Sequence, residues 1–555
     1  MFRPQLFAKR AMRVELSKLN FTAPRQLISK RYVQTEAKGS KPIKSGFFLW
    51  SLRATLFGAA AGWAYLTYLV YKESNPGAQL PQSELKENGL KKKNIVILGS
   101  GWGAVSCLKS LDTTKYNVTI VSPRNYFLFT PLLPSVPSGT IDIKSICDPV
   151  RTLARKNTGE VKYLEAAATN IDPVNKTIKI EHKSQRLLIG DAFTNESDPI
   201  ESELSYDYLV YAVGATVNTF GIKGIYEHAS FLKEANDATA VRQKLFNQIE
   251  ASRLLPEGSD DRKRLLNFVV CGGGPTGVEL AAEIKDYIDQ DLSKFIPGIE
   301  KEMKVTLIEA QGNVLASFHP RLIEYTKAVF REQDLELRCN TMVNSVDEKN
   351  VYATYRYPNG ETEKVVIPYG TLVWAGGNAQ REITKSLAGK IIEQQTARRG
   401  LLVDDFLKLD GDDSIYALGD CTFTQNPPTA QTAHQQGEFL GEHFNKLAKL
   451  EDLKYELSQS DADSKPRIEK KISRAEKVIV PFEYIHQGAL AYIGGERAVA
   501  DLTWGSWSTV ALGGNLTFFF WRSAYVTMLL GIKNKIFVVS DWVKVAIFGR
   551  DCSQE

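Results

Sequence analysis

"LLNFVVCGGGPTGVELAAEIKDYI", residues 265–288, decides the fold. A short apolar run leads directly into Gly272, Gly274 and Gly277, which are spaced as G-x-G-x-x-G, and a helical pattern follows. This order of strand, loop and helix brings backbone N–H groups and the positive end of a helix together, where they bind the pyrophosphate of a dinucleotide. The stretch therefore predicts a Rossmann-type nucleotide-binding domain.

The strand that follows this domain's first helix indicates which nucleotide it binds. "MKVTLIEAQG" ends at Glu309, at the position where an acid accepts hydrogen bonds from the two ribose hydroxyls. A carboxylate at this place also repels a 2′-phosphate. We therefore expect NADH rather than NADPH.

A second loop of the same design occurs earlier, in "KKKNIVILGSGWGAVSCLKSL", residues 91–111. The first glycine allows a tight turn, the second lets the backbone approach a pyrophosphate, and the last two residues let helix and strand pack closely. The next strand ends at Ser122, where an NADH site would have an acid, so this half is assigned to the adenine dinucleotide of a flavin. The four loop residues are Gly99, Gly101, Gly103 and Ala104.

Two such units, about 170 residues apart, predict an α/β flavoprotein with two dinucleotide-binding domains, the second inserted in the first. Two apolar strands that end at small residues, Gly214 and Gly376, fit chain crossings near the cofactors. In "SIYALGDC", Gly419 allows a close turn, and Asp420 either binds a flavin ribityl hydroxyl or caps a helix.

The N-terminus has the composition of a mitochondrial targeting segment. Residues 1–45 hold eleven Lys or Arg and only two acids, which accounts for much of the net charge of +5, so that charge does not indicate nucleic-acid binding. An apolar stretch at 46–71 predicts a transmembrane anchor, and the polar stretch at 72–92 reads as a linker. This order would place the body across the membrane from the leader, in the intermembrane space.

The remaining boundaries follow from the motifs. We expect the FAD-binding domain at 93–262 and 381–480, the NADH-binding domain at 263–380 and a membrane-docking region at 481–555. The six cysteines show neither C-x-x-C nor zinc-like spacing, so no metal site is expected.

From residue 93 to 551, the combined motifs resemble type II NADH:quinone oxidoreductases, the single-chain alternative NADH dehydrogenases that do not pump protons. The motifs are the two glycine loops, "RNYFLFTPLLPSVPSGT" (124–140), "YALGD", "PPTAQTAHQQG" (427–437) and "DWVKVAIFGRD". With its leader and apolar segment, the chain is most similar to the external mitochondrial form of yeasts, bound to the inner membrane.

The resemblance implies non-covalent FAD, NADH as hydride donor and ubiquinone as acceptor. It places Gly99, Gly101, Gly103, Ala104, Ser122, Thr130, Pro131, Gly214, Gly419 and Asp420 at FAD. It places Gly272, Gly274, Gly277, Glu279, Glu309 and Gly376 along NADH, and Gln431, His434 and Gln435 at the quinone.

Three of these residues are candidates for catalysis: Glu279, Gln431 and His434. Glu279 either positions the reactants and relays a proton or only favours the dipole of its helix. His434 either donates a proton or a hydrogen bond to the quinone or packs at a helix start. On a helix, Gln431, His434 and Gln435 would share a face.

The C-terminal sequence "LTFFFWRSAYVTMLLGIKNKIFVVSDWVKVAIFGRD" splits into two amphipathic pieces. This composition fits a helix pair lying in a membrane interface, and it also fits the interface of a homodimer. The charged run at 457–471 lacks the loop Gly and terminal Glu of an EF-hand, so no calcium site is expected.

The predicted function is transfer of a hydride from NADH to FAD and of two electrons to ubiquinone, which feeds cytosolic NADH into the respiratory chain. One alternative is the matrix-facing form of the same enzyme. Another is a sulfide:quinone oxidoreductase, which needs a redox cysteine pair, and Cys147 with Cys339 is the one combination that the sequence leaves open. A third is a membrane-tethered NADH-binding signalling protein.

Overall fold

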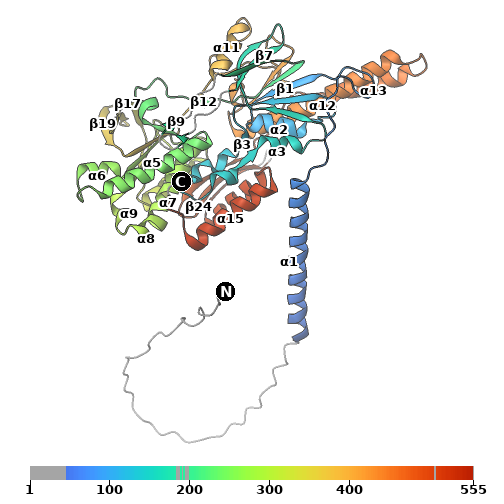
Figure 1. Cartoon of the computed structure of the whole chain (residues 1–555). Coiled ribbons are helices and arrows are strands. Elements are labelled where there is room, and N and C mark those ends of the chain that lie inside the picture. Colours follow the sequence, from blue (N-terminus) through green and yellow to red (C-terminus); the bar gives the residue numbers. More distant parts are fainter. Residues whose placement is uncertain (1–44, 183–187, 190–191, 194–198, 505–507, 554–555) are drawn as a thin grey trace, which may run out of the picture. The chain divides into compact units, whose positions relative to one another are not determined.

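The computed structural model describes residues 45–182, 188–189, 192–193, 199–504 and 508–553. The predicted targeting segment therefore lies almost wholly outside the described residues. The chain divides into two compact units, Met1–Tyr65 and Leu66–Glu555. In the first unit, the described residues form the greater part of helix α1 (Ser45–Ser74), and the second unit holds everything else (Figure 1).

Helix α1 forms where the apolar segment was predicted, but it does not meet the requirements of the expected anchor. No helix in the described ranges is long and apolar enough to cross a membrane. The transmembrane prediction for 46–71 is therefore not supported.

The predicted linker is also different from what its composition indicated. Leu80 pairs with Gly159 beside the first sheet, and the Gln79 side chain donates to the carbonyls of Ala154, Asn157 and Gly159. A polar sequence with two prolines is typical of a flexible linker. Here the Gln79 amide instead binds backbone carbonyls at an edge of the folded domain. Part of the segment 72–92 therefore belongs to the domain.

Two parallel sheets form the body. The first has the order β22-β11-β1-β2-β5, and the second has the order β13-β20-β14-β15-β16. The first comprises β1 (Asn94–Leu98), β2 (Asn117–Val121), β5 (Val161–Leu164), β11 (Tyr208–Tyr211) and β22 (Ile415–Ala417). The second comprises β13 (Ser230–Phe231), β14 (Asn267–Cys271), β15 (Lys304–Ile308), β16 (Glu336–Arg338) and β20 (Thr371–Trp374).

The strand order shows how one unit is inserted in the other. The chain completes four strands of the first sheet, builds the whole second sheet, and returns to pair β22 with β11. The central strands are apolar and buried because both faces of each parallel sheet are covered. Helices pack on one face of each sheet, and antiparallel strands pack on the other, together with the helix at 382–390 in the first sheet. Among these helices are α2 (Trp102–Ser110), α5 (Ala235–Arg253), α7 (Pro275–Tyr287), α11 (Glu382–Lys390) and α12 (Ala430–Gln459).

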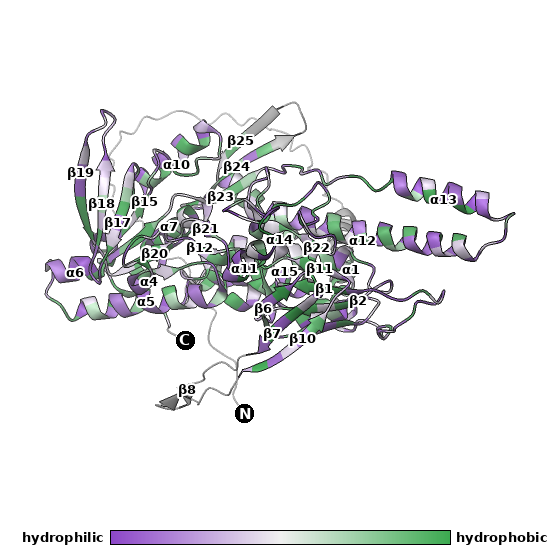
Figure 2. Cartoon of the chain, turned by 90° about the horizontal axis from the view of Figure 1, so that it is seen from above, coloured by the Kyte–Doolittle hydropathy of each residue, from purple (hydrophilic) through white to green (hydrophobic). Residues whose placement is uncertain are grey.

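Smaller antiparallel sheets and two helix pairs complete the body. Helix α12 is followed by α13 (Lys465–Lys477), which Figure 2 colours largely hydrophilic. The antiparallel sheets comprise β6 (Ala167–Asp172), β7 (Thr177–His182) and β10 (Ile200–Ser205); β17 (Thr341–Val346), β18 (Asn350–Arg356) and β19 (Thr362–Pro368); and β23 (Ala489–Gly494), β24 (Arg497–Trp504) and β25 (Ser508–Gly514).

The C-terminal region packs on the second parallel unit. Helix α14 (Asn515–Met528) lies on β24, and α15 (Ile532–Phe548) contacts α14 and the short helix η2 (Ile143–Ile146). Strand β23 lies against α7, so the helix that follows the second glycine loop is enclosed between its own sheet and the C-terminal sheet. Buried residues from all of these elements form one continuous apolar core.

Candidate active site

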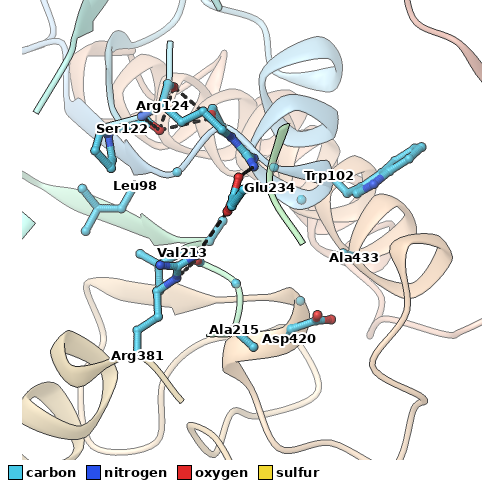
Figure 3. Close-up of a pocket in the computed structure, with 18 of the residues that line it drawn as sticks. Leu98, Trp102, Ser122, Arg124, Val213, Ala215, Glu234, Arg381, Asp420 and Ala433 are labelled. Atoms are coloured by element: carbon cyan, nitrogen blue, oxygen red, sulfur yellow. Dashed lines mark hydrogen bonds and ion pairs between the residues drawn. The ribbon is translucent and has the colours of Figure 1, made fainter. Parts of the chain in front are cut away.

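A cavity of about 860 Å³ lies at the carboxyl ends of β1, β2, β11 and β22 (Figure 3). This is the edge of a parallel sheet where ligands bind, because the following loops and helix N-termini converge there. Ala104 and Pro131 are the two predicted FAD residues that do not line the wall. The predicted residues that line it are Gly99, Gly101, Gly103, Ser122, Thr130, Gly214, Gly419 and Asp420.

The first glycine loop has the geometry that a dinucleotide requires. Gly99 has φ +113°, and a Cβ there would lie 2.3 Å from the Ala212 carbonyl oxygen. A Cβ at Gly103 would lie 2.1 Å from Leu418 Cδ1, so this position must also be glycine for α2 to pack on the strand ends. The loop and the N-terminus of α2 form a backbone cradle, and the cavity volume fits FAD.

The opposite wall is the turn after β22. Gly419 has φ +76°, and its N–H donates to Oε1 of Gln436 at 2.7 Å. Burial raises the pKa of the Asp420 carboxyl, and the nearby Lys233 ammonium opposes this shift. Gln436 was not among the predicted site residues, although it lies in the quoted "PPTAQTAHQQG" motif. Its amide connects that motif to the turn of the cavity wall.

The second glycine loop is equally constrained. Gly272 has φ +120°, and a Cβ at Gly277 would lie 1.9 Å from the Gly272 carbonyl oxygen, whereas a Cβ at Gly274 would meet nothing within 4 Å. The loop therefore packs closely on its own helix but stays open on the side of Gly274. Gly376 lies at the end of the neighbouring strand, with its N atom 3.2 Å from a Cβ built on Gly272.

The Glu309 carboxylate lies at the end of β15 and is fixed by two backbone groups. The Gly273 N–H donates to Oε2 at 2.6 Å, and the Gln311 N–H donates to Oε1 at 2.7 Å. These bonds orient the carboxylate beside the loop, at the position where the ribose of a dinucleotide is recognised.

Glu279 is buried on α7 and does not line the flavin cavity. Its Oε1 accepts a hydrogen bond from the Tyr492 N–H of β23 at 3.1 Å. Burial raises the pKa of the Glu279 carboxyl to about 8, although this hydrogen bond favours the charged form. The side chain is therefore a group that can hold or release a proton near neutral pH.

Aromatic rings connect the flavin cavity to the C-terminal helices. Trp102 lines the cavity and donates from Nε1 to Thr130 Oγ1 at 3.0 Å. Its ring centroid lies 5.4 Å from that of Phe129, which lies 6.0 Å from that of Tyr525 on α14, and the Tyr525 ring contacts Trp521 at 4.8 Å. None of these four residues was predicted as part of the site, because they come from distant parts of the chain.

The three residues predicted at the quinone do not all contact the same part of the protein. Gln431 accepts from Tyr484 Oη at 2.6 Å, and Gln435 both accepts from the Ile485 N–H at 2.9 Å and donates to the Ile485 carbonyl at 2.7 Å. These amides hold the segment that leads to β23 against the start of α12.

His434 faces α2 instead. Its Nδ1 lies 2.6 Å from Ser106 Oγ, and its ring contacts Trp102 edge to face. Burial lowers the pKa of the His434 imidazole, which the Glu438 carboxylate partly opposes. Of the three predicted residues, His434 is therefore the one that contacts the aromatic wall of the cavity.

The cysteines are free, and among the described residues no group of three or more His, Cys, Asp or Glu is arranged to hold a metal. Burial raises the pKa of the Cys147 thiol to about 11 and that of Cys421 to about 12. These thiols are therefore poor nucleophiles at neutral pH.

Residues 93–437 match the family described as pyridine nucleotide-disulphide oxidoreductase, and residues 486–551 match the NDH2 C-terminal domain. The chain is 47% identical to the external NADH-ubiquinone oxidoreductase 2, mitochondrial, of Saccharomyces cerevisiae, over 96% of this chain and 93% of the relative. It is 45% identical to the external alternative NADH-ubiquinone oxidoreductase of Yarrowia lipolytica, over 93% and 89%.

A solved structure of NDH2 from Plasmodium falciparum in complex with NADH superposes with a TM-score of 0.71 at 28% identity. It covers 83% of this chain and 100% of that chain. Both parts of the body, the two-nucleotide unit and the C-terminal sheet with its helices, are therefore accounted for by the same relatives. The chain belongs to the pyridine nucleotide-disulphide oxidoreductases and, within them, to the type II NADH:quinone oxidoreductases.

Proposed function

We propose that this protein is an FAD-dependent NADH:ubiquinone oxidoreductase that does not pump protons and that feeds cytosolic NADH into the mitochondrial respiratory chain. The observation that carries this proposal is the pair of glycine loops on separate parallel sheets, one of them in a cavity that fits FAD. The relatives named as external mitochondrial NADH-ubiquinone oxidoreductases support it.

Bound FAD would supply the chemistry that accepts a hydride from NADH and passes two electrons to a quinone. The chain's own residues bind and orient the reactants. The residues that hold the flavin nucleotide are those of the loop at 99–103 with Ser122, Thr130, Gly214, Gly419 and Asp420. Gly272, Gly277 and Gly376 let the second loop pack closely on its sheet and helix, and Gly274 leaves its open side free for NADH. Glu309 accepts the ribose hydroxyls of NADH.

The quinone reaches the flavin along the aromatic wall from α14. The Trp102 ring lines the cavity, and the buried rings of Phe129 and Tyr525 continue from it toward α14. His434 approaches from α12, while Gln431 and Gln435 position the neighbouring chain. Glu279, with its pKa of about 8, holds a proton beside this wall and can release it as the quinone is reduced.

The protein acts at the mitochondrial inner membrane, with the catalytic body in the intermembrane space and α14 and α15 lying on the bilayer. Apolar side chains of these helices are exposed, among them Leu516, Phe519, Ile547 and Phe548. A membrane surface would cover them and give a hydrophobic quinone direct access. The same face is our candidate for the contact in a homodimer.

The test is steady-state oxidation of NADH by the purified protein with a ubiquinone analogue. We expect NADH consumption that requires both the quinone and bound FAD. If sulfide and not NADH reduces the quinone, the protein is instead the alternative, a sulfide:quinone oxidoreductase. If neither sulfide nor NADH reduces the quinone, the proposed enzyme activity is wrong. Protease accessibility in intact mitoplasts tests the membrane side, because an intermembrane-space body is digested and a matrix-facing body is protected.

A further inference from the structure

Three charged side chains meet at the rim of the flavin cavity, and neither their sequence context nor the glycine motifs pointed to them. Arg124 Nη1 lies 2.7 Å from Glu234 Oε2, and Arg381 Nη2 lies 3.8 Å from Glu234 Oε1. All three line the cavity, and Figure 3 shows Glu234 lying between the two arginines. Their side chains are partly exposed, as expected at an entrance.

The three residues come from separate segments of the chain. Arg124 follows β2 of the first sheet, Glu234 lies between β13 of the second sheet and α5, and Arg381 stands just before α11 on the return path to the first sheet. Each is also fixed on its own side of the rim. Arg124 Nε donates to Ser100 Oγ at 3.3 Å, and Arg381 Nε donates to the Val213 carbonyl at 2.9 Å. The ion pairs therefore join segments that are otherwise separated by the cavity.

The position of Arg124 relates this cluster to the nucleotide. A Cβ built on Gly101 would lie 3.9 Å from Arg124 Nη2, so the guanidinium lies over the loop that binds a pyrophosphate. Two guanidiniums at one rim would repel each other, and the carboxylate between them removes that repulsion. A guanidinium at this place also attracts a phosphate.

We propose that Arg124, Glu234 and Arg381 form a clasp that retains FAD, closing the rim of the cavity over the pyrophosphate and slowing its release. The clasp rests on the proposed function, because it requires FAD in this cavity. Glu234 acts as a positioning residue that holds both arginines, and Arg124 is the cofactor-binding member.

The test compares the dissociation of FAD from the wild-type holoenzyme and from Glu234→Gln, which keeps the side-chain shape and removes the charge. FAD release is followed by the recovery of flavin fluorescence after dilution and by the ratio of flavin to protein absorbance after gel filtration. A partly exposed ion pair of this kind predicts a dissociation rate about fivefold higher in the variant. Added NaCl should speed release from the wild type more than from the variant.

Two variants serve as controls. Glu382→Gln removes another carboxylate that lines the cavity but is paired with Lys385 outside the clasp. Asp237→Asn weakens the start of α5, where Asp237 accepts the N–H groups of Lys233 and Glu234 at 2.9 and 2.8 Å, and leaves the clasp charges unchanged. Both controls should release FAD at close to the wild-type rate.

The clasp is overturned if Glu234→Gln releases FAD at the wild-type rate, or if either control accelerates release as much as Glu234→Gln does. Thermal unfolding of each apoprotein separates a general loss of stability from a specific loss of retention, since the clasp predicts little change without FAD. A wild-type protein that binds no flavin would contradict the proposed function itself. A flavoprotein that releases FAD at the same rate with and without the Glu234 charge would contradict only the clasp.

Discussion

Glu279 shows how burial, rather than residue type, decides what a carboxyl group does. It lies on α7 against the C-terminal sheet, where burial disfavours the charged carboxylate more than the Tyr492 N–H and the Trp521 side chain favour it. The sequence places the residue two positions after Gly277, the last glycine of the second loop, but the sheet that buries it lies more than two hundred residues later. Local sequence patterns do not contain that information.

The pKa of Glu279 predicts a pH-dependent stability. The unfolded chain releases this proton near the ordinary value of 4.5, whereas the folded protein keeps it until about 8. The folded state therefore binds more protons in this window, and stability falls as pH rises through it. Glu279→Gln lacks this loss of stability. As pH rises through this window, the melting temperature of the variant should therefore increase by a few degrees relative to that of the wild type.

Differential scanning calorimetry across this range measures the difference, with Glu250→Gln at an exposed position of α5 as the control. A constant offset between Glu279→Gln and the wild type at every pH would show that the Glu279 pKa is not raised in the folded state.

We predict that Glu309 sets the choice between the two nicotinamide nucleotides, NADH and NADPH. In Glu309→Gln the side chain loses its charge and one acceptor, so the ribose hydroxyls of NADH bind less well and a 2′-phosphate is no longer repelled. We expect the ratio of kcat/KM for NADH to that for NADPH to fall about tenfold or more. Steady-state kinetics with both nucleotides measure it, and Glu336→Gln on the neighbouring strand should leave the ratio unchanged. An unaltered ratio in Glu309→Gln would assign discrimination to other residues.

At the scale of elements, the contact between α2 and α12 sets the width of the flavin cavity. A Cβ at Gly437 would lie 2.3 Å from the Gly103 carbonyl oxygen, and one at Gly441 would lie 2.7 Å from the Cys107 carbonyl oxygen. These glycines let the two helices approach so closely that α12 supports the first glycine loop. We therefore expect the motif at 427–437 to contribute to FAD binding as well as to the proposed quinone region.

Gly441→Ala should force α12 away from α2. Overpacking at such a contact costs about 1–3 kcal/mol of stability, and we expect a lower melting temperature and a reduced FAD content in the purified protein. Gly389→Ala on α11 is the matched control, because a Cβ there meets nothing within 4 Å. Equal melting temperatures and flavin contents for the two variants would show that the helix contact is not needed for the cavity.

How far the sequence predicts these elements depends on whether the signal is local. Gly99, Gly272 and Gly419 were predicted because a strand, a turn and a helix are neighbours in the chain, and their positive φ values agree. The roles of Gln431 and Gln435 were not, because their partners lie about fifty residues further along the chain. The clasp residues were missed for the same reason.

At the scale of the whole molecule, residues 72–92 and 46–71 show the limits of composition. Polar, proline-containing sequence predicted a linker, yet Gln79 and Leu80 are bound to the first domain. An uncharged aromatic-rich stretch predicted a span, yet its helix is not apolar enough for one. Composition does not contain the specific contacts that bind Gln79 and Leu80 to the domain.

The exposed apolar face of α14 and α15 predicts how the whole enzyme meets its quinone. Phe519 is 61% exposed and Ile547 is 66% exposed. The double variant Phe519→Glu with Ile547→Glu should no longer bind liposomes, since each apolar side chain buried in the membrane surface contributes about 2 kcal/mol to binding. Its turnover of ubiquinone embedded in liposomes should be slower by about tenfold or more. Its activity with a water-soluble quinone analogue should be unchanged.

Flotation and steady-state assays measure both properties, with Leu254→Glu at the end of α5 as an exposed apolar control. If the double variant still floats with liposomes but sediments as a monomer where the wild type is a dimer, the face is a subunit contact and the membrane-docking proposal is wrong.

Anaerobic stopped-flow absorbance of the purified holoenzyme tests the proposed reaction most directly. Mixing with NADH should bleach the bound flavin in a fast phase, and a second mixing with a ubiquinone analogue should restore the oxidised spectrum. A flavin that NADH does not reduce would contradict the proposed enzyme. A flavin that NADH reduces but a quinone does not reoxidise would favour the membrane-tethered NADH-binding signalling protein.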